Sequence, residues 1–433
     1  MKSSNFQIIL IVVFIIGAVV AVLIFAGIIP VGQTGSTAVG NVVAWGTIPK
    51  NSLSGTLDEY NRTSKTFKVN YVQKNSATFD GDLVEALASG TGPDLILLPE
   101  NLILRYTNKI TVIPYTTFPQ RTFQDTFVNE ANLYLTDKGI IGFPVVIDPL
   151  VIYYNRNSFQ SANISEPPKT WDDVASYIPK FTVRDTSGNI TKSAISLGTF
   201  SNIPHAKDIL SMFFLQAGNS IVVNHSGQYV STLVDTTTLG NRTQASGALE
   251  FYTAFSNPLQ SLYSWNKTLP NSLDAFTSGD SAMYIGFASE YQTIQKKNPN
   301  LSFDVARIPQ AKNAETIVTF GKMTAASIMK SSKNPSGAYA AAQLLSGADF
   351  SLKIATDLNL PPPRRDLLAG KPLGTSLPVF YQSALVARSW LDPNPEKTDD
   401  IFKGMIENVT SGRLRASEAI SSASANIDIL LKP

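Results

Sequence analysis

The spacing of apolar positions alternates between strand-like and helix-like periods in the part of the chain that follows residue 40. The expected strands are residues 41–46, 67–72 and 94–98, and the expected helices are residues 52–64 and 78–89. This strand–helix–strand–helix–strand order predicts a parallel sheet covered by helices. Such sheets bind ligands just beyond the carboxyl ends of their strands, here residues 46–50 and 99–101.

Further elements are predicted downstream. Strands are expected at residues 140–148 and 151–155, separated by Asp148-Pro149, and at residues 281–285, followed by a loop that begins at Gly286. Thr170 is the expected N-cap of a helix that starts at Trp171. Residues 206–217 and 338–345 are expected helices, and residues 303–308 and 317–320 are expected strands that return to the first part of the fold.

The N-terminus carries an unbroken apolar run over residues 8–29. As a helix, this run would be about 33 Å long, enough to cross a hydrocarbon core of about 30 Å. Lys2 is the only charged side chain before Lys50, which favours a cytoplasmic N-terminus and an extracytoplasmic body. We therefore expect a single-pass membrane anchor and tether over residues 1–40. A cleaved signal peptide is the alternative, with a weak cleavage site near Ser36.

Composition narrows the possible functions. The body is too long for one ordinary core, so two lobes are expected. Lys and Arg number 35 against 33 Asp and Glu, and the absence of a basic run argues against nucleic-acid binding. The chain has no cysteine and two histidines, which excludes disulfides, thiolate metal sites and a multi-histidine metal centre. No metal or cofactor is expected.

Five segments, in order, resemble the extracellular solute-binding proteins of carbohydrate ABC importers, the maltose-binding-protein-like group. They begin at Ala88 (ASGTGPDLI), Gly142 (GFPVVIDPLVIYYN), Pro167 (PPKTWDD), Phe276 (FTSGDSAM) and Ser411 (SGR). The resemblance that they carry extends over nearly all of residues 41–433. The chain lacks the lipobox cysteine that many Gram-positive relatives carry, and the N-terminal anchor would replace the lipid.

The resemblance implies an α/β, two-lobed, type II periplasmic-binding-protein-like fold that closes around a ligand. Each lobe would be a mainly parallel sheet flanked by helices, with an N-terminal transmembrane helix added. We expect residues 41–147 and 314–365 to form the first lobe, and residues 148–313 and 366–433 to form the second.

A sugar site needs aromatic platforms for the apolar faces of the ligand and planar polar groups for its hydroxyls. The candidates are loop and strand-end residues, together with positions where relatives contact their ligands. The expected ligand-binding residues are Trp45, Thr47, Glu100, Asn101, Asp148, Tyr153, Asn202, His205, Gly286, Phe287 and Trp390.

The predicted function is the substrate-binding component of an ABC importer, which captures a sugar or oligosaccharide and delivers it to the permease subunits. We expect a monomer without catalytic activity. One alternative is a membrane-anchored component that presents its ligand to a sensor. Another is a carbohydrate-active hydrolase, for which Glu100, Asp148 and Glu290 are the available carboxylates.

Overall fold

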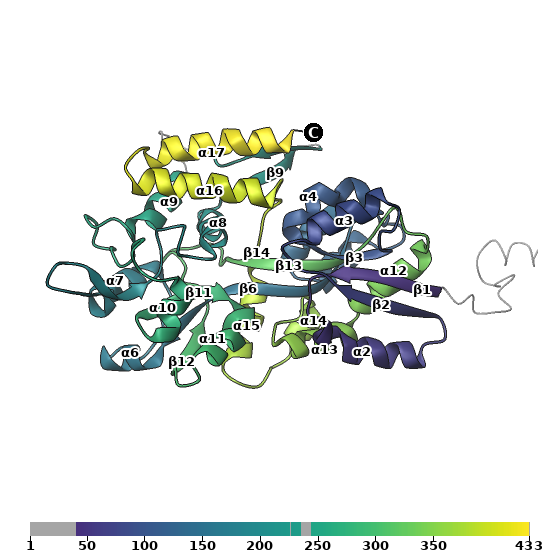
Figure 1. Cartoon of the computed structure of the whole chain (residues 1–433), viewed down its shortest axis with the longest axis horizontal. Helices are drawn as coiled ribbons and strands as arrows, with labels where there is room; N and C mark the ends of the chain where they lie inside the picture. Colours follow the sequence, from purple (N-terminus) through teal and green to yellow (C-terminus); the bar gives the residue numbers. More distant parts are fainter. Residues whose placement is uncertain (1–39, 226, 235–243, 433) are drawn as a thin grey trace, which may run out of the picture.

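The computed structural model describes residues 40–225, 227–234 and 244–432. The chain forms two α/β lobes side by side, joined by strands that run from one lobe into the other (Figure 1). The apolar run at residues 8–29 lies outside the described residues. No helix in the described part of the chain has the length and apolar character needed to cross a membrane.

The first lobe contains the parallel sheet that the sequence predicts. Strand β1 (Gly40–Gly46) lies between β2 (Phe67–Gln73) and β3 (Leu95–Pro99) and is parallel to both. Helices α2 (Lys50–Thr63) and α3 (Phe79–Ala88) connect these strands. All five elements lie within about two residues of their predicted positions. In each of them, the spacing of apolar residues and the length of the segment indicate the same type of element.

Two long strands belong to both lobes. Strand β6 (Phe143–Asn155) pairs with β13 (Thr319–Ile328) over its first half, then with β11 (Ser281–Phe287) and β12 (Phe303–Ala306). The prediction of two strands separated by Asp148-Pro149 is therefore wrong. Pro149 lies where β6 changes partners, so its missing N–H interrupts the ladder where the ladder is already changing. A third connection, β14 (Ala387–Arg388), pairs with the start of β13.

The sheet of the second lobe is mixed, so the prediction of a mainly parallel sheet is wrong there. Strand β11 is antiparallel to β6 and parallel to β8 (Ile190–Ile195), and β7 (Val183–Arg184) is antiparallel to β8. Strand β12 pairs with the far end of β6 and does not return to the first lobe. Both second-lobe neighbours of β6, β11 and β12, run antiparallel to it, so the parallel pattern is lost at β6.

The remaining described elements are short strands, helices and 3₁₀ turns. The short strands are β4 (Leu135–Thr136), β5 (Gly139–Ile140), β9 (Val222–His225) and β10 (Gln228–Ser231). The helices up to β11 are α4 (Ile103–Tyr106), α5 (Gln120–Thr126), α6 (Arg156–Ser161), α7 (Trp171–Phe181), α8 (Ala206–Gln216), α9 (Gln244–Ala254) and α10 (Ser272–Ser278). The later helices are α11 (Tyr291–Lys297), α12 (Pro335–Leu345), α13 (Ala348–Leu358), α14 (Arg365–Leu368), α15 (Ser376–Leu385), α16 (Pro395–Thr410) and α17 (Ala416–Leu431). The 3₁₀ turns are η1 (Glu100–Leu102), η2 (Thr107–Lys109), η3 (Asn129–Tyr134) and η4 (Ala288–Glu290).

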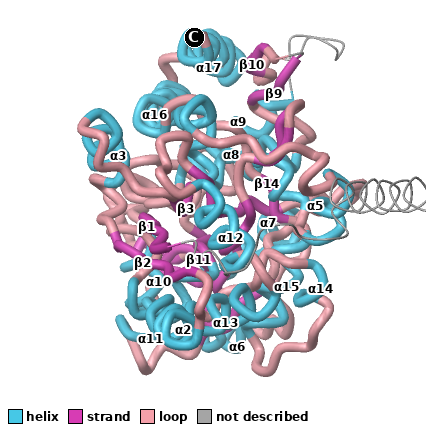
Figure 2. The backbone as a smooth tube through the Cα atoms, turned by 90° about the vertical axis from the view of Figure 1, so that its right-hand side faces the viewer, coloured by secondary structure: helices cyan, strands magenta, loops and turns pink. Residues whose placement is uncertain are grey.

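Buried apolar side chains form separate clusters in the two lobes. One cluster gathers β1–β3 with α2, α3 and α12, and another gathers α7–α9 with α16 and α17. Helices α16 and α17 lie side by side at one end of the molecule, next to the β9–β10 hairpin (Figure 2). The exact residue boundaries proposed for the lobes stay a prediction.

Local capping follows the sequence closely at α7. Thr170 accepts a hydrogen bond from the Asp173 amide, and the Asp173 carboxylate accepts one from the Thr170 amide. This reciprocal capping box confirms the predicted helix start.

Candidate functional site

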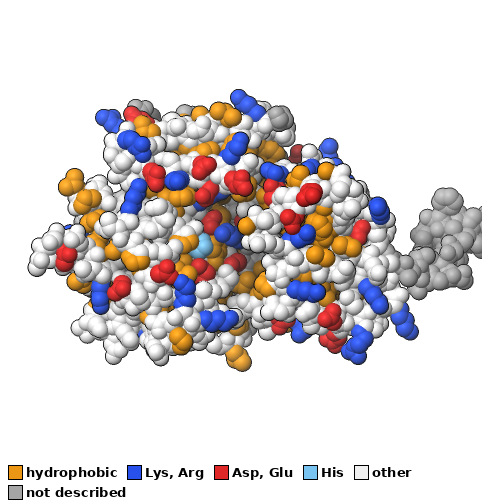
Figure 3. All heavy atoms as spheres, viewed as in Figure 1, with side chains coloured by type: hydrophobic (Ala, Val, Ile, Leu, Met, Phe, Trp, Pro, Cys, Tyr) orange, Lys and Arg blue, Asp and Glu red, His pale blue; other side chains and the backbone are white. Residues whose placement is uncertain are grey.

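A hollow lies between the two lobes, and acidic and basic side chains gather in it together with a histidine (Figure 3). On one side of the crossing strands it includes a cavity of about 470 Å³. Thr47 and Val146 line this cavity, together with Asp148, Ser289 and Lys322. Elements of both lobes therefore contribute to one polar cleft.

Glu100 is the polar group that follows the central strand of the first lobe. It lies in η1, directly after β3, with an exposed fraction of only 3%. Its Oε2 accepts a hydrogen bond from the Met323 amide at 3.0 Å, which ties it to the crossing strand β13. Burial raises the pKa of Glu100 to about 8, although Lys322 and the backbone amides act in the opposite direction. A carboxyl group with this pKa is mostly protonated at neutral pH.

Lys322 extends from β13 toward the second lobe. Its Nζ lies 2.9 Å from Oδ2 of Asp208 on α8 and 4.1 Å from the centre of the Phe287 ring. Removal from water acts to lower the pKa of Lys322, but the carboxylates of Asp208, Glu100 and Asp148 raise it above its ordinary value. Lys322 also lines the cavity that contains Asp148.

Asp148 lies opposite Lys322 in the register of the β6–β13 pair. Its Oδ1 accepts a hydrogen bond from the Ser289 amide of the second lobe at 3.0 Å. Burial raises the pKa of Asp148 to about 6, against the lowering effect of the bonds from Ser289 and the charge of Lys322. Its carboxyl group thus belongs to the crossing strand and lines the cavity.

His205 and Glu290 complete the cluster from the second lobe. His205 precedes α8, and its Nε2 lies 3.1 Å from Oε1 of Glu290, while its Nδ1 lies 3.9 Å from Oδ2 of Asp208. The Glu290 carboxylate also accepts hydrogen bonds from the Phe287 amide at 3.0 Å and from the Tyr284 hydroxyl. The imidazole packs edge-on against Phe287.

This arrangement suits non-covalent recognition of a polar molecule. Carboxyl groups accept hydrogen bonds from ligand hydroxyls, and the imidazole and ammonium groups donate them. Among the described residues, no group of three or more His, Asp or Glu side chains is arranged to hold a metal ion.

Five of the residues predicted from sequence meet around this cleft. Phe287 lies beneath the Lys322 ammonium group, and Glu100 bonds to the amide of the next residue, Met323. His205 pairs with Glu290, and Thr47 and Asp148 line the cavity. Thr47, Glu100 and Phe287 lie at or just after strand ends, Asp148 lies in the middle of β6, and His205 precedes α8.

Three other predicted residues are engaged in packing contacts. Tyr153 is fully buried, and its hydroxyl donates to the Phe287 carbonyl at 2.6 Å. The Asn202 amide donates to the carbonyls of the loop that precedes α10, while its oxygen accepts from Thr199 and Trp265. Trp390 is 4% exposed and donates from its indole nitrogen to Ser211. These contacts give each side chain a structural role in the fold.

Gly286 and Phe287 belong to β11, which corrects the expectation that a loop starts at Gly286. A Cβ on Gly286 would lie 2.2 Å from Oε2 of Glu290 and 2.5 Å from the Tyr284 ring. The absence of a side chain at Gly286 therefore allows the Glu290 carboxylate to lie against the backbone.

The two remaining predicted residues lie in the first lobe. Trp45 is half-buried on β1, and the ammonium group of Lys74 lies 3.8 Å from the centre of its ring. Asn101 is half-buried beside Glu100 in η1. Neither residue lines the cavity that contains Asp148 and Lys322.

Sequence reasoning missed Lys322 and Asp208 as site residues. Lys322 is a single charge within the otherwise uncharged run of β13, and Asp208 follows His205 by three positions on one helical face. An isolated lysine in a strand is also typical of an exposed edge strand. No local sequence pattern connects Lys322 with Asp208.

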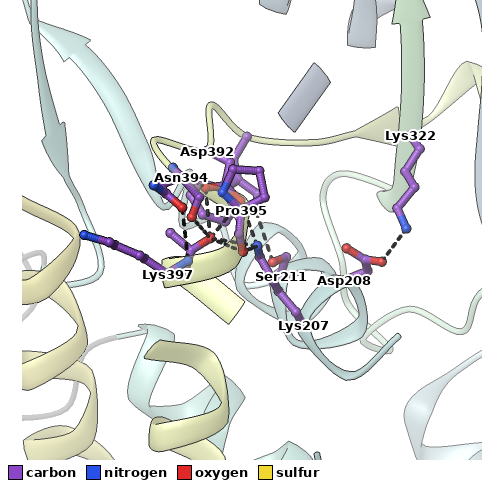
Figure 4. Close-up of polar contacts among 10 residues, drawn as sticks. Lys207, Asp208, Ser211, Lys322, Asp392, Asn394, Pro395 and Lys397 are labelled. Carbon is purple, nitrogen blue, oxygen red and sulfur yellow. Dashed lines mark hydrogen bonds and ion pairs between the residues drawn. The ribbon is translucent and has the colours of Figure 1, made fainter. Parts of the chain in front are cut away.

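The first turn of α8 is anchored on two sides (Figure 4). Asp208 points to Lys322, whereas the neighbouring Lys207 points to the segment that follows β14. Lys207 Nζ lies 2.7 Å from Oδ2 of Asp392 and 2.7 Å from the Thr398 hydroxyl. These ion pairs attach the start of α8, which His205 precedes, to β13 and to the segment that follows β14.

Comparisons with known proteins agree with this architecture. The sequence profile of the family described as bacterial extracellular solute-binding protein matches residues 56–378. A binding protein of Brucella abortus is 20% identical over 365 residues, which cover 81% of this chain and 82% of the relative.

Solved structures share the fold at low identity. An ABC transporter solute-binding protein from Thermotoga lettingae, bound with α-D-tagatose, is 21% identical, with a TM-score of 0.67 over 91% of this chain and 100% of the other. A cyclic α-maltosyl-1,6-maltose binding protein from Arthrobacter globiformis is 16% identical, with a TM-score of 0.73 over 90% of this chain and 99% of the other.

Proposed function

Since the chain belongs to the bacterial extracellular solute-binding protein family, we propose that it captures a sugar or oligosaccharide outside the cytoplasm for an ABC importer. The observation that carries the proposal is the interlobe cleft, where Asp148 and Lys322 of the crossing strands line one cavity with Ser289 of the second lobe. The similar proteins from Thermotoga lettingae and Arthrobacter globiformis, which by their names bind a sugar, support the carbohydrate class.

In this proposal, the ligand hydroxyls bond to Asp148 and Glu100 from the first-lobe side and to His205 from the second lobe. A ligand that bridges both lobes lowers the free energy of the closed arrangement relative to the open one. The permease then receives the closed form, and no covalent chemistry takes place on this chain.

The apolar run at residues 8–29 forms the membrane anchor in this proposal, and residues 30–40 form the tether. The protein acts as a monomer that stays near its permease. Retention of the body in the membrane fraction after expression of the full chain, and its release when residues 1–39 are deleted, would support this part of the proposal.

Isothermal titration calorimetry of residues 40–433 against neutral mono- and oligosaccharides tests the proposed ligand class. We expect at least one sugar to bind, and Asp148→Ala to weaken its binding by about tenfold or more, because a buried hydrogen bond to a charged group contributes about 1.5–3 kcal/mol. The matched control is Asp125→Ala, which removes a carboxylate from the exposed surface of α5. Binding of only non-carbohydrate solutes, or hydrolysis of the bound sugar, would contradict the proposal.

A further inference from the structure

The environment of the Lys322 ammonium group has the composition of a cation-binding site. The face of the Phe287 ring lies 4.1 Å from Nζ, and Asp208 lies 2.9 Å from it on the other lobe. An aromatic face combined with a carboxylate is the usual receptor for an organic ammonium group. Here the chain itself supplies the ammonium group, from the crossing strand β13.

The charges around Lys322 explain why an ammonium group is held there. Asp148 and the His205–Glu290 pair lie beside the Lys322–Asp208 pair, and His205 is the other described group of the cluster that can carry positive charge. Without Lys322, Asp208 would lose the ammonium group that pairs with it, and Asp148 would lose a neighbouring positive charge. An empty site of this kind would attract a cation from solution.

We propose that Lys322 occupies a cation site within the ligand cleft and thereby sets the charge class of the ligand. With its own ammonium group in place, the cleft accepts uncharged sugars and disfavours amine-bearing ones. A ligand amine would have to displace Lys322 from Asp208 and Phe287, or remain beside it at a cost in repulsion. The selection of neutral sugars rests on the function proposed above, whereas the cation site itself does not.

The cation site can be tested without knowledge of the natural ligand. Lys322→Ala removes the part of the side chain that corresponds to n-propylammonium, so that this small cation should fit the vacated space. We expect n-propylammonium to raise the thermal unfolding midpoint of Lys322→Ala in a saturable way. Its apparent affinity should be about tenfold or more above that for the wild-type protein, which corresponds to about 1.4 kcal/mol.

Two controls separate a specific site from general salt or solvent effects. The uncharged analogue 1-propanol should produce no such rise in Lys322→Ala. The double variant Lys322→Ala/Asp208→Asn should lose the response to n-propylammonium, because the carboxylate that anchors the cation is absent. An equal response in the wild-type protein, with 1-propanol or in the double variant would overturn the proposal.

The effect on ligand class is tested with D-glucose and D-glucosamine, which differ only in the 2-amino group. Lys322→Met keeps the length of the side chain without its charge. In this variant we expect the affinity for D-glucosamine relative to D-glucose to rise by about tenfold or more over the wild-type ratio. An unchanged ratio would contradict the charge selection.

The possible outcomes distinguish this inference from the proposed function. If neither sugar binds the wild-type protein or Lys322→Met, the n-propylammonium experiment decides on the cation site alone. If n-propylammonium fails while neutral sugars bind, the inference is wrong and the proposed function stands. If neither Lys322 variant folds, Lys322 has a structural role and the inference is likewise wrong.

Discussion

Lys322 and Asp148 face each other across the antiparallel pair of strands that joins the two lobes. Lys322 continues to Asp208 on α8, and Asp148 continues to the Ser289 amide in η4. Each side chain therefore links a crossing strand to the second lobe, in the cleft where a ligand is proposed to bind. Movement of the lobes would change the polar contacts of both residues, and this geometry leads to the expectations below.

The first prediction concerns Glu100 and pH. Its pKa of about 8 exceeds the ordinary value of 4.5, so the folded state retains a proton that the unfolded chain releases between these two values. The free energy of unfolding should therefore fall as pH rises through this window. Glu100→Gln stays neutral and keeps an acceptor for the Met323 amide, so it should lose that fall. Relative to wild type it should gain on the order of 4 kcal/mol on going from about pH 5 to about pH 9.

Urea unfolding at several pH values measures this difference. Glu59→Gln, on the exposed surface of α2, is the matched control and should follow the wild-type curve. A Glu100→Gln curve parallel to that of wild type would show that Glu100 is ionised in the folded state at neutral pH.

The second prediction concerns the ion pair that anchors α8. Asp392 is 3% exposed and accepts bonds from Lys207 and Thr398, so Asp392→Ala leaves the Lys207 ammonium group without its carboxylate in a nearly buried place. Removal of one partner of a buried pair costs about 3–5 kcal/mol. Chemical denaturation should show a loss of this size.

An exposed ion pair provides the comparison. Arg121 and Asp125 on α5 lie 3.5 Å apart with side chains 92% and 72% exposed. Asp125→Ala should change the stability by no more than about 0.5 kcal/mol. Equal losses in Asp392→Ala and Asp125→Ala would mean that the Lys207–Asp392 pair does not hold α8 in place.

The third prediction concerns Gly286. An added Cβ would overlap both the Glu290 carboxylate and the Tyr284 ring, so Gly286→Ala should displace Glu290 from the Phe287 amide. Overpacking of this kind costs about 1–3 kcal/mol. Since Glu290 lies beside His205, sugar binding should weaken as well.

Gly55→Ala serves as the control for the third prediction. Gly55 lies within α2, and a Cβ there would have no heavy atom within 4 Å beyond its own helix and chain neighbours. Alanine is a better helix former than glycine, so this variant should be up to about 1 kcal/mol more stable than wild type. If thermal unfolding shows no difference between the two variants, the contact of Glu290 with Gly286 has no energetic weight.

The parts of the fold that the sequence predicted well depend on local signals. Thr170 and Asp173 lie within one helical turn, so the capping box was visible from their spacing alone. Pro149 misled for the same reason, since a proline usually marks the end of a strand. Within β6, Pro149 is accommodated because the strand changes its partner there, from β13 to β11. Both partner strands are far from β6 in the sequence, so local patterns do not reveal this change.

The same contrast applies to the candidate site. Glu100 was a candidate because it follows an apolar strand-length run, and Asp148 was a candidate through the resemblance to solute-binding proteins. The Lys322–Asp208 pair was not, because it joins a strand and a helix that only the tertiary fold brings together. Phe287 and Trp390 were both chosen as candidate aromatics, yet only the structure separates a ring that contacts Lys322 from one that packs on Phe402.

The central claim is that a bound sugar closes the two lobes over the cleft, and a distance measurement between the lobes tests it most directly. Because the chain has no cysteine, Glu85→Cys on α3 and Lys403→Cys on α16 would carry spin labels at those two exposed positions alone. Saturation with a sugar that binds in calorimetry should shift the distance distribution between the labels to shorter values, and Asp148→Ala should need more sugar for the same shift. An unchanged distribution at saturation would contradict the account.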